Sequence, residues 1–219
     1  MGIFRGPNIV TDGLVFAVDA GSERSYPGSG TTVSNIIDGS TGTLTNGVGF
    51  DSANGGSFTF DGVNDYIATP GNLFGTGGLT ISFFANWSNT AGYQVPFDGG
   101  YSSNNGILIE SNGTTNYIRV YFGTTKVIEE VWNFSNNTWY NFVVTRNGTT
   151  VQCYLNGEIF GSPITNSASM NSSNSLIGKY SGGEFFNGKI PNIKIYNEGL
   201  TADEVQQNYN AQKSRFGLW

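Results

Sequence analysis

Asn-Gly dipeptides between alternating apolar runs constrain this chain most. The clearest lies in R-N-G-T, residues 146–149, which separates N-F-V-V-T-R from T-V-Q-C-Y-L. Asn and Gly tolerate the positive φ that a type I′ turn requires, and such turns join two antiparallel strands. Two further dipeptides, at residues 112–113 and 156–157, also lie between strand-like runs. The sequence therefore predicts a succession of antiparallel hairpins.

Period-two alternation indicates strands along most of the chain. Ser57 to Asp61 and Asp65 to Thr69 are predicted to form a hairpin around G-V-N, whereas residues 20–49 show only weak strand character. The other predicted strands are Leu14–Asp19, Leu79–Trp87, Tyr93–Asp98, Gly106–Glu110, Asn116–Phe122, Thr125–Trp132, Thr138–Arg146 and Thr150–Leu155. Because so many meandering strands cannot bury both faces in one open sheet, an all-β sandwich of two facing sheets is expected.

One short helix is predicted near the C-terminus, after an alternating strand that ends in I-K-I-Y. Thr201 is a suitable N-cap, and Glu204 three residues later completes a capping box. Leu200 and Val205 have the spacing of a hydrophobic staple. Val205 and Tyr209, four residues apart, give the helix a narrow apolar stripe that can lie on a sheet.

Size and charge exclude several classes of partner. At 219 residues the chain is long enough for one substantial core. Its formal net charge is −6, and its ten Lys and Arg residues are scattered, so nucleic acid and anionic membranes are not expected as partners. Apolar runs fall far short of the roughly 20 residues that span a bilayer. The start M-G-I-F-R-G-P-N lacks a signal-peptide pattern, so synthesis in the cytoplasm is expected.

The absence of histidine removes most of the usual catalytic groups. Without it the chain has no Ser-His-Asp or Cys-His arrangement and none of the common zinc sites. Cys153 is the single cysteine, so no internal disulfide can form. It alternates with Val151 and Leu155, which predicts a buried structural thiol.

Three segments carry a resemblance to a known superfamily. They are F-T-F-D-G-V-N-D-Y-I (58–67), W-Y-N-F-V-V-T-R-N-G-T-T-V-Q-C-Y-L-N-G (139–157) and the closing strand and helix. They resemble the concanavalin A-like lectin/glucanase superfamily, in its laminin G-like branch. The resemblance implies a jelly-roll sandwich over residues 13–212, between an N-terminal arm, 1–12, and a C-terminal tail, 213–219. Because this fold hosts lectins, hydrolases and structural modules, it leaves the function open.

A narrower resemblance concerns G-L-V-F-A-V-D-A-G-S-E-R-S-Y-P-G-S-G-T-T (13–32), F-D-S-A-N-G-G-S-F-T-F-D-G (50–62) and E-V-Q-Q-N-Y-N-A-Q-K-S-R-F-G (204–217). These are similar to laminin G-like proteins of tailed bacteriophages, especially marine cyanophages. The resemblance implies a non-enzymatic virion structural protein: a capsid decoration, fibre or tail-surface component. Its partners would be other virion proteins in an oligomeric assembly, and host-surface carbohydrate. The alternatives are a free-standing carbohydrate-binding lectin and, third, a glycoside hydrolase.

The hydrolase alternative needs two carboxylates that face each other across a cleft. Glucanases of the superfamily carry them on one strand in a pattern close to E-x-D-x-E. The nearest approach here is V-I-E-E-V-W, in which Glu129 and Glu130 are adjacent and therefore face opposite ways in a strand. Glu110 stands alone in its segment. The sequence thus favours a protein that is not an enzyme.

Carbohydrate binding on this fold uses aromatic rings that stack on sugars and Asn or Asp side chains that bond to hydroxyl groups. The candidates are Tyr93, Tyr101, Asp98, Asn104 and Trp132, with Trp87 beside them in the same turn-rich region. Core packing is the alternative for Trp87 and Trp132, because both lie at strand ends. Tyr93 and Tyr101 are predicted to be exposed, since Gly, Ser and Asn residues surround them.

A structural calcium ion is a third expectation, because many laminin G-like modules bind one. D-G-V-N-D offers Asp61, Asn64 and Asp65, whose hard oxygen atoms suit calcium. The same letters are a turn signal, which is the alternative interpretation. No other cofactor is expected. At the two ends, apolar residues such as Phe216 and Trp219 either dock a partner or close the sandwich.

Overall fold

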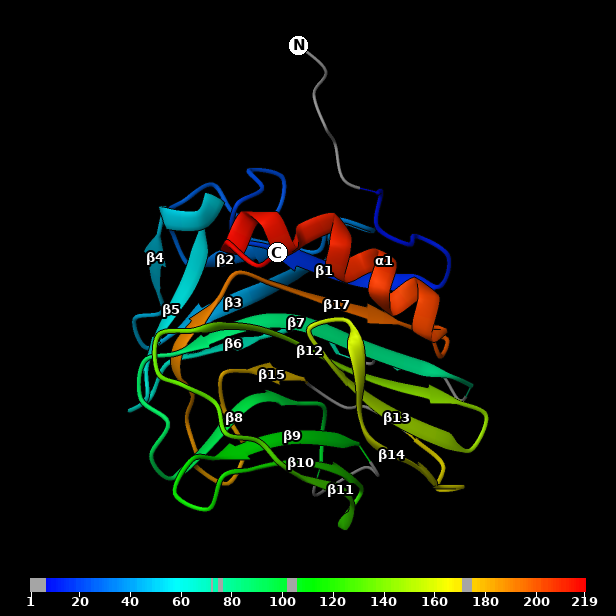
Figure 1. Ribbon diagram of the computed structural model, residues 1–219. Coiled ribbons are helices and arrows are strands. Elements are labelled where there is room, and N and C mark those ends of the chain that lie inside the picture. The colour runs from blue at the N-terminus through cyan, green and yellow to red at the C-terminus, as the bar shows by residue number, and fades with distance from the viewer. Residues whose placement is uncertain (1–6, 72, 75–76, 102–105, 171–174) are drawn as a thin grey trace.

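The computed structural model describes residues 7–71, 73–74, 77–101, 106–170 and 175–219, which form two facing antiparallel sheets (Figure 1). Sheet A comprises β1 (Leu14–Asp19), β4 (Gly49–Asp51), β5 (Ser57–Asp61), β7 (Leu79–Trp87), β12 (Trp139–Asn147), β13 (Thr150–Leu155), β14 (Glu158–Thr165), β16 (Asn187–Ile190) and β17 (Asn192–Tyr196). Sheet B comprises β2 (Thr32–Ser34), β3 (Thr41–Thr45), β6 (Tyr66–Ala68), β8 (Tyr93–Asp98), β9 (Ile107–Asn112), β10 (Tyr117–Phe122), β11 (Thr125–Val131) and β15 (Leu176–Ile177). The predicted all-β sandwich is confirmed.

Strand order shows how the chain moves between the sheets. Sheet A runs β14-β13-β12-β7-β16-β5-β4, with β17 also paired to β7 and β1 paired to β17. Sheet B runs β11-β10-β9-β8-β15-β6-β3-β2. Consecutive hairpins build the β8–β11 and β12–β14 parts, whereas late strands such as β15 and β16 return to fill the middle of each sheet. Central positions are therefore occupied by strands that lie far from their neighbours in sequence.

The Asn-Gly dipeptides lie in the hairpins that the sequence predicts, with one difference in turn geometry. Asn156 and Gly157, between β13 and β14, have φ values of 52° and 82°, as a type I′ turn requires. Between β12 and β13, Gly148 has a positive φ of 58°, but Asn147 is still paired in the ladder and does not. The pairing is thus confirmed at both sites, and the type I′ form at Asn156–Gly157.

The predicted hairpin of residues 57–69 is wrong. β5 pairs with β4 and β16 in sheet A, whereas β6 pairs with β3 and β15 in sheet B. The short link after Asp61 carries the chain across the sandwich, and Gly62 takes a positive φ of 76° there. Phe58 and Ile67 then reach one core from opposite sheets. Alternation is the same in a hairpin and in a crossover, so it could not distinguish them.

Trp87 lies at the centre of the core, which fills the space between the sheets. Its side chain is completely buried and packs edge-on against Trp132, with ring centroids 5.1 Å apart, and against Phe186. Its Nε1–H donates a 3.0 Å hydrogen bond to Ser111 Oγ on sheet B. A buried indole that bonds across the sandwich fixes the two sheets relative to each other.

The outer face of sheet A is covered by α1 (Ala202–Gln212) and the 3-10 turn η2 (Lys213–Phe216), as Figure 1 shows. Thr201 and Glu204 form the predicted capping box. Val205 is buried in one cluster with Leu200. The ring of Tyr209 stacks on that of Phe84 of β7, with centroids 6.3 Å apart. The apolar stripe of the helix therefore lies on the sheet as the sequence predicts. No helix within the described ranges is long and apolar enough to span a bilayer.

Both ends of the described chain are attached to this covered face. The Val10 N–H donates to Asn208 Oδ1 of α1 at 2.7 Å. Arg215 Nη1 contacts both Asp19 carboxylate oxygens at 2.9 and 2.8 Å, and its other nitrogens donate to the carbonyls of residues 54–56. Phe216 is buried against Phe84, so it closes the sandwich, whereas Trp219 is 93% exposed. The second 3-10 turn, η1, is Ala53–Gly55.

Candidate functional site

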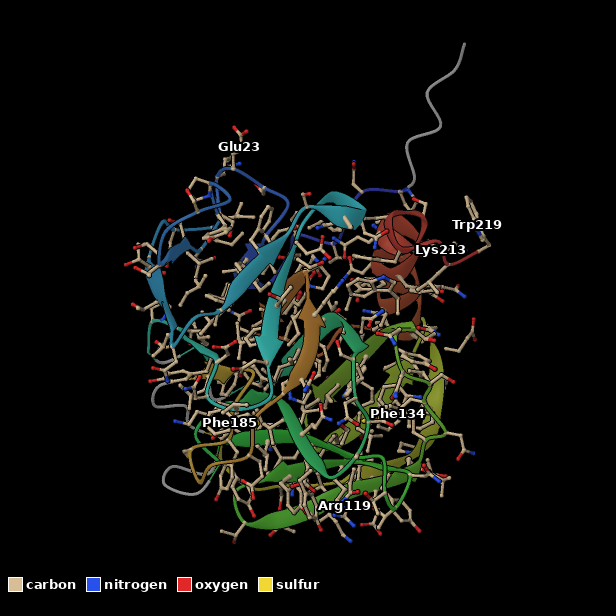
Figure 2. All side chains as sticks on the ribbon, turned by 90° about the vertical axis from the view of Figure 1, so that its left-hand side faces the viewer. Glu23, Arg119, Phe134, Phe185, Lys213 and Trp219 are labelled. Carbon is tan, nitrogen blue, oxygen red and sulfur yellow. The ribbon has the colours of Figure 1, made fainter. Side chains whose placement is uncertain are left out.

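The outer face of sheet B carries polar and aromatic side chains that are partly or fully exposed. On β10, Ile118, Val120 and Phe122 point into the core. Tyr117 and Arg119 alternate with them and therefore point outward. Figure 2 shows Arg119 at the end of the molecule opposite Lys213 and Trp219. We call this outward surface of β8–β11 the tyrosine face.

Arg119 joins two carboxylates across three strands. The register places Arg119 opposite Glu110 of β9 on one side and Glu129 of β11 on the other. Its Nη1 lies 3.2 Å from Glu110 Oε1, and its Nε lies 2.6 Å from Glu129 Oε2, which also contacts Lys126 Nζ at 2.6 Å. Burial raises the pKa of Glu110, and the contact with Arg119 opposes this shift. The contacts with Lys126 and Arg119 lower the pKa of Glu129.

Two tyrosine rings flank the guanidinium group. The Arg119 carbon Cζ lies 5.8 Å from the centroid of the Tyr93 ring and 5.7 Å from that of Tyr117. Both tyrosines sit opposite Asn112 of β9, so they lie two strands apart, about 10 Å. Tyr93 is 50% exposed, and Val131, in the same row, is 58% exposed. The row offers an aromatic surface that a ligand can reach.

Tyr101 belongs to a second group of rings at the edge of this face. Its ring meets those of Tyr121 and Tyr180 edge-on, at 5.2 and 5.7 Å. Asp98 Oδ1 accepts hydrogen bonds from the Gly100 and Tyr101 N–H groups at 2.9 Å, while Oδ2 accepts one from the Ser181 N–H at 3.0 Å. Because Asp98 is buried, it positions Tyr101 rather than meeting a ligand directly.

Of the predicted carbohydrate-binding residues, Tyr93 lies on the tyrosine face, Tyr101 lies at its edge and is only partly exposed, and Asp98 is buried. Asn104 lies outside the described residues. Trp132 is only 4% exposed and packs against Trp87, Phe134, Tyr140 and Phe142, so its prediction as a sugar-binding residue is wrong. The core-packing alternative holds for both tryptophans, because alternation points them inward between the sheets.

The sequence-based reasoning missed Arg119, Tyr117, Tyr121 and Tyr180. The alternation in Y-I-R-V-Y-F, residues 117–122, is a signal that could have found three of them, since it places Tyr, Arg and Tyr on one face. Glu110 was expected to stand alone, but the strand register brings it to Arg119. Glu129 and Glu130 do face opposite ways: Glu129 pairs with Arg119, whereas Glu130 lies beside Gly161 of β14.

The residues predicted to bind calcium form a hydrogen-bonded turn. Asp61 Oδ1 accepts hydrogen bonds from the Val63 and Asn64 N–H groups at 2.8 and 3.2 Å. Asp65 is 4% exposed, and its Oδ2 accepts a bond from the Asp61 N–H, while its Oδ1 has no partner. Within the described part of the chain, no group of three or more Asp, Glu, His or Cys side chains could hold a metal. Calcium at this turn remains a prediction.

Replacing Asp65 with Asn should stabilise the protein at neutral pH. Burial, and then the charge of Asp61, raise the pKa of Asp65, so the folded state holds its proton more tightly than the unfolded state does. Stability is therefore lost as the pH rises from the unfolded pKa through the raised folded-state pKa. Chemical denaturation should show that the free energy of unfolding of Asp65→Asn increases relative to that of the wild type as the pH rises from 3 to 7. A calcium-dependent rise in Tm that Asp65→Asn abolishes would contradict this and establish a metal site.

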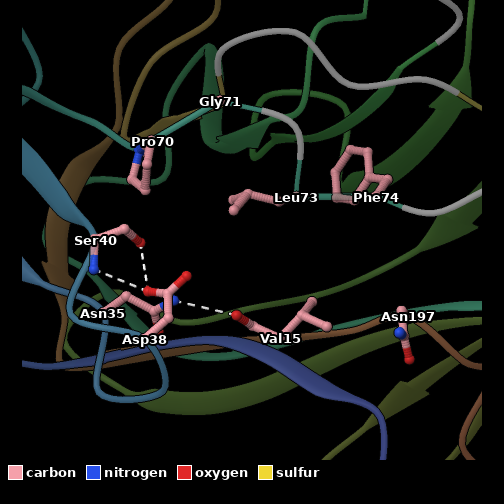
Figure 3. Close-up of a pocket in the computed structure, with 9 residues that line it drawn as sticks. All are labelled: Val15, Asn35, Asp38, Ser40, Pro70, Gly71, Leu73, Phe74 and Asn197. Carbon is pink, nitrogen blue, oxygen red and sulfur yellow. Dashed lines mark hydrogen bonds between the residues drawn. The ribbon is translucent and has the colours of Figure 1, made fainter.

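A cavity of about 410 Å³ lies on another part of the molecule (Figure 3). It is lined by Val15, Asn35, Asp38, Ser40, Pro70, Gly71, Leu73, Phe74 and Asn197. Asp38 Oδ1 accepts bonds from the Ser40 hydroxyl (2.6 Å), the Ser40 N–H (2.8 Å) and Asn35 Nδ2 (2.8 Å). The Ser40 contacts lower the pKa of Asp38. These bonds hold the 35–40 loop together and occupy Asp38 Oδ1 within it.

A known family model matches most of the sandwich. The model described as the concanavalin A-like lectin/glucanases superfamily covers residues 60–206 of the 219-residue chain. The chain belongs to this superfamily. The match confirms the resemblance seen in F-T-F-D-G-V-N-D-Y-I and in the 139–157 hairpin. No curated protein matches the sequence of this superfamily member.

Solved structures share the fold of this superfamily member at low sequence identity. Domain 4 of AbnA, an extracellular GH43 arabinanase from Geobacillus stearothermophilus in complex with arabinotriose, is 16% identical, with a TM-score of 0.73 over 90% of this chain and 98% of that domain. The sialidase of Trypanosoma rangeli is 15% identical, with a TM-score of 0.71 over 94% of this chain but 34% of its own. A structure of botulinum neurotoxin type C, whose cell entry depends on interaction with two ganglioside molecules, is 15% identical, with a TM-score of 0.69 over 91% of this chain and 51% of its own. This likeness shows the fold alone.

Proposed function

We propose that this superfamily member is a non-enzymatic carbohydrate-binding module and that glycans bind on the tyrosine face. The observation that carries the proposal is the row formed by Tyr93, which is 50% exposed, and Tyr117, which is partly exposed, with the Arg119 guanidinium within 6 Å of both ring centroids. Tyrosine presents an apolar ring face together with a hydroxyl group, which suits the mixed surface of a sugar. Exposed aromatic surface of this kind marks interaction sites on otherwise polar proteins.

The comparisons support this proposal. The AbnA domain, which this chain covers almost completely in length, was solved in complex with arabinotriose. The neurotoxin uses gangliosides, which also carry sugars. Tyr93 and Tyr117 lie on strands two apart, with backbones about 10 Å from each other, so the row suits an oligosaccharide better than a single sugar.

The non-enzymatic part of the proposal rests on the carboxylates of the tyrosine face. Glu110 and Glu129 both contact the same guanidinium group, at 3.2 and 2.6 Å. A glycosidase needs one carboxylic acid and one carboxylate free to act on the two sides of a glycosidic bond. Arg119 engages an oxygen of each glutamate, so neither side chain is free to act on a glycosidic bond; the contact lowers the pKa of Glu129 and opposes the rise that burial causes in the pKa of Glu110. Release of sugar from any glycan, if Glu110→Gln abolished it, would contradict this part.

We also propose that the module is displayed on a phage virion, as the resemblance of residues 13–32, 50–62 and 204–217 suggests. The arrangement of the two faces supports display. Sheet A is covered by α1, η2 and the segment around Ile9 and Val10, and the exposed Trp219 lies at that end (Figure 2). A module attached to other virion proteins there would present the tyrosine face outward, toward host-surface carbohydrate. Mass spectrometry of purified virions tests this part.

Alanine substitutions on the tyrosine face test carbohydrate binding. Tyr93→Ala and Tyr117→Ala should each weaken binding to any glycan found on an array by about tenfold or more, because central aromatic contacts dominate interface energies. Trp219→Ala is the matched control, since it removes an exposed aromatic ring from the opposite end. Isothermal titration calorimetry with the strongest array hit measures all three. Affinity that survives both tyrosine substitutions would show that the glycan binds elsewhere.

A further inference from the structure

We propose that the tyrosine face selects uncharged glycans and rejects glycans that carry carboxylates, such as sialylated or uronate-containing chains. This inference rests on the proposed function and names the ligand class of the same site. It depends on how Arg119 is held, because an arginine on a binding face is the group that would normally recognise an anionic sugar.

Both fork-shaped edges of the Arg119 guanidinium are already in use. A carboxylate is bound bidentately either by Nε with one terminal nitrogen or by the two terminal nitrogens together. Here Nε contacts Glu129 at 2.6 Å, and Nη1 contacts Glu110 at 3.2 Å and the Tyr93 hydroxyl at 3.4 Å. Each edge therefore includes one nitrogen that donates to a protein carboxylate. An acidic sugar would have to displace Glu110 or Glu129 before it could bind bidentately.

The ion pairs on this face are also well placed to persist. The side chains of Arg119, Glu110 and Glu129 are 16%, 13% and 29% exposed, so water screens them less than it screens a fully exposed pair. The rings of Tyr93 and Tyr117 both contact the guanidinium group, at 5.8 and 5.7 Å from Cζ to the ring centroids. Displacing a glutamate would therefore also disturb the tyrosine row that the ligand needs.

Further negative charge surrounds this arrangement. Glu184 lies close enough to Glu110 to raise its pKa, and one oxygen of Glu184 is buried without a hydrogen-bond partner. Lys126 adds a positive charge, but its ammonium group is bonded to Glu129. Lys179 lies farther along the sheet, with its ammonium group 4.5 Å from the ring centroid of Tyr66. An incoming carboxylate would meet neutralised cations and repulsive carboxylates, whereas hydroxyl groups would meet hydrogen-bond acceptors.

Pairs of related neutral and acidic glycans test the inference. Polygalacturonate and its methyl ester share one backbone, and sialyllactose and lactose differ by the sialic acid. In titrations at low salt, we expect the wild type to bind the uncharged member of any recognised pair at least about tenfold more tightly than the charged member. The double variant Glu110→Gln, Glu129→Gln, which keeps size and hydrogen bonding but frees Arg119, should shift this ratio toward the charged member by at least about tenfold.

The matched variant is Glu158→Gln, which removes a carboxylate from β14 in sheet A, where it bonds to Gln206. It should leave the ratio between charged and uncharged probes unchanged. If the double variant fails to fold, salt dependence of the wild type replaces it: raising the ionic strength should narrow the ratio, since screening weakens repulsion.

Three results are distinguishable. Preference for the uncharged member, lost in the double variant or reduced by salt, supports the inference. Equal or tighter binding of the charged member by the wild type overturns the inference and leaves the proposed function standing. No binding to any neutral or acidic member of a glycan array overturns both.

Discussion

Replacing Trp132 with alanine should lower the free energy of unfolding by about 3–5 kcal/mol, the usual cost of removing a buried Trp or Phe side chain. Trp132 is 4% exposed and lies within 6 Å of the ring centroids of Trp87, Phe134 and Tyr140. Its removal leaves a cavity between two sheets, and the rigid strands on both sides can close it only partly. Chemical denaturation followed by far-ultraviolet circular dichroism measures the loss.

Trp219→Ala is the matched control for this substitution. It removes the same side chain from a position that is 93% exposed, so its free energy of unfolding should stay within about 0.5 kcal/mol of the wild type. The folded fraction of Trp132→Ala should also keep the glycan affinity of the wild type, because the indole does not reach the tyrosine face. A stable Trp132→Ala protein that had lost glycan binding would restore Trp132 to the binding site.

Alternation of apolar and polar residues predicts some strands of this fold and misses others. Alternation placed β7, β8 and β13 at the bounds that the structure has, although both faces of these strands are largely buried. It did not predict β14 (Glu158–Thr165), which lies at a sheet edge, is largely exposed and contains Gly161 and Pro163. Edge strands need little apolar surface, so they leave little pattern in the sequence.

The sequence predicts only part of the candidate site, because some of its residues are brought together by strand register. Tyr93 and Tyr101 stand in turn-rich surroundings, which is local information that the sequence carries. Arg119 owes its position to the register that places it opposite Glu110 and Glu129, on strands joined through two separate hairpins. Register depends on turn geometry and on the packing of whole strands, so a one-residue change would separate the three side chains.

Lys194 should give this protein an unusual rise in stability at alkaline pH. It lies on β17, beneath the C-terminal end of α1, where its Nζ donates to Asn192 Oδ1 at 3.1 Å and to Gln212 Oε1 at 2.7 Å. Burial lowers the pKa of Lys194 to about 8; the charge of Asp19 opposes this shift and that of Arg215 adds to it. The folded state therefore holds a buried ammonium group at neutral pH at a cost to stability.

The sign of the effect follows from proton binding. Between pH 8 and 10.5 the unfolded chain still holds the lysine proton while the folded state has released it. Stability then rises with pH, and this single group should contribute about 3 kcal/mol over the interval. Other groups, such as the tyrosines, also titrate at alkaline pH, so the measurement is the difference between the wild type and Lys194→Met.

Urea denaturation at several pH values should show that the wild type gains stability over Lys194→Met from pH 8 to 10.5, with little change in the difference below pH 7. Lys189→Met is the control: Lys189 lies on neighbouring β16, is 37% exposed and pairs with Asp51 at 2.6 Å. The difference in free energy of unfolding between Lys189→Met and the wild type should not change in this way between pH 8 and 10.5. A difference between wild type and Lys194→Met that stayed flat across the interval would show that Lys194 keeps an ordinary pKa, and so that water or a rearranged carboxylate reaches its ammonium group beneath the helix.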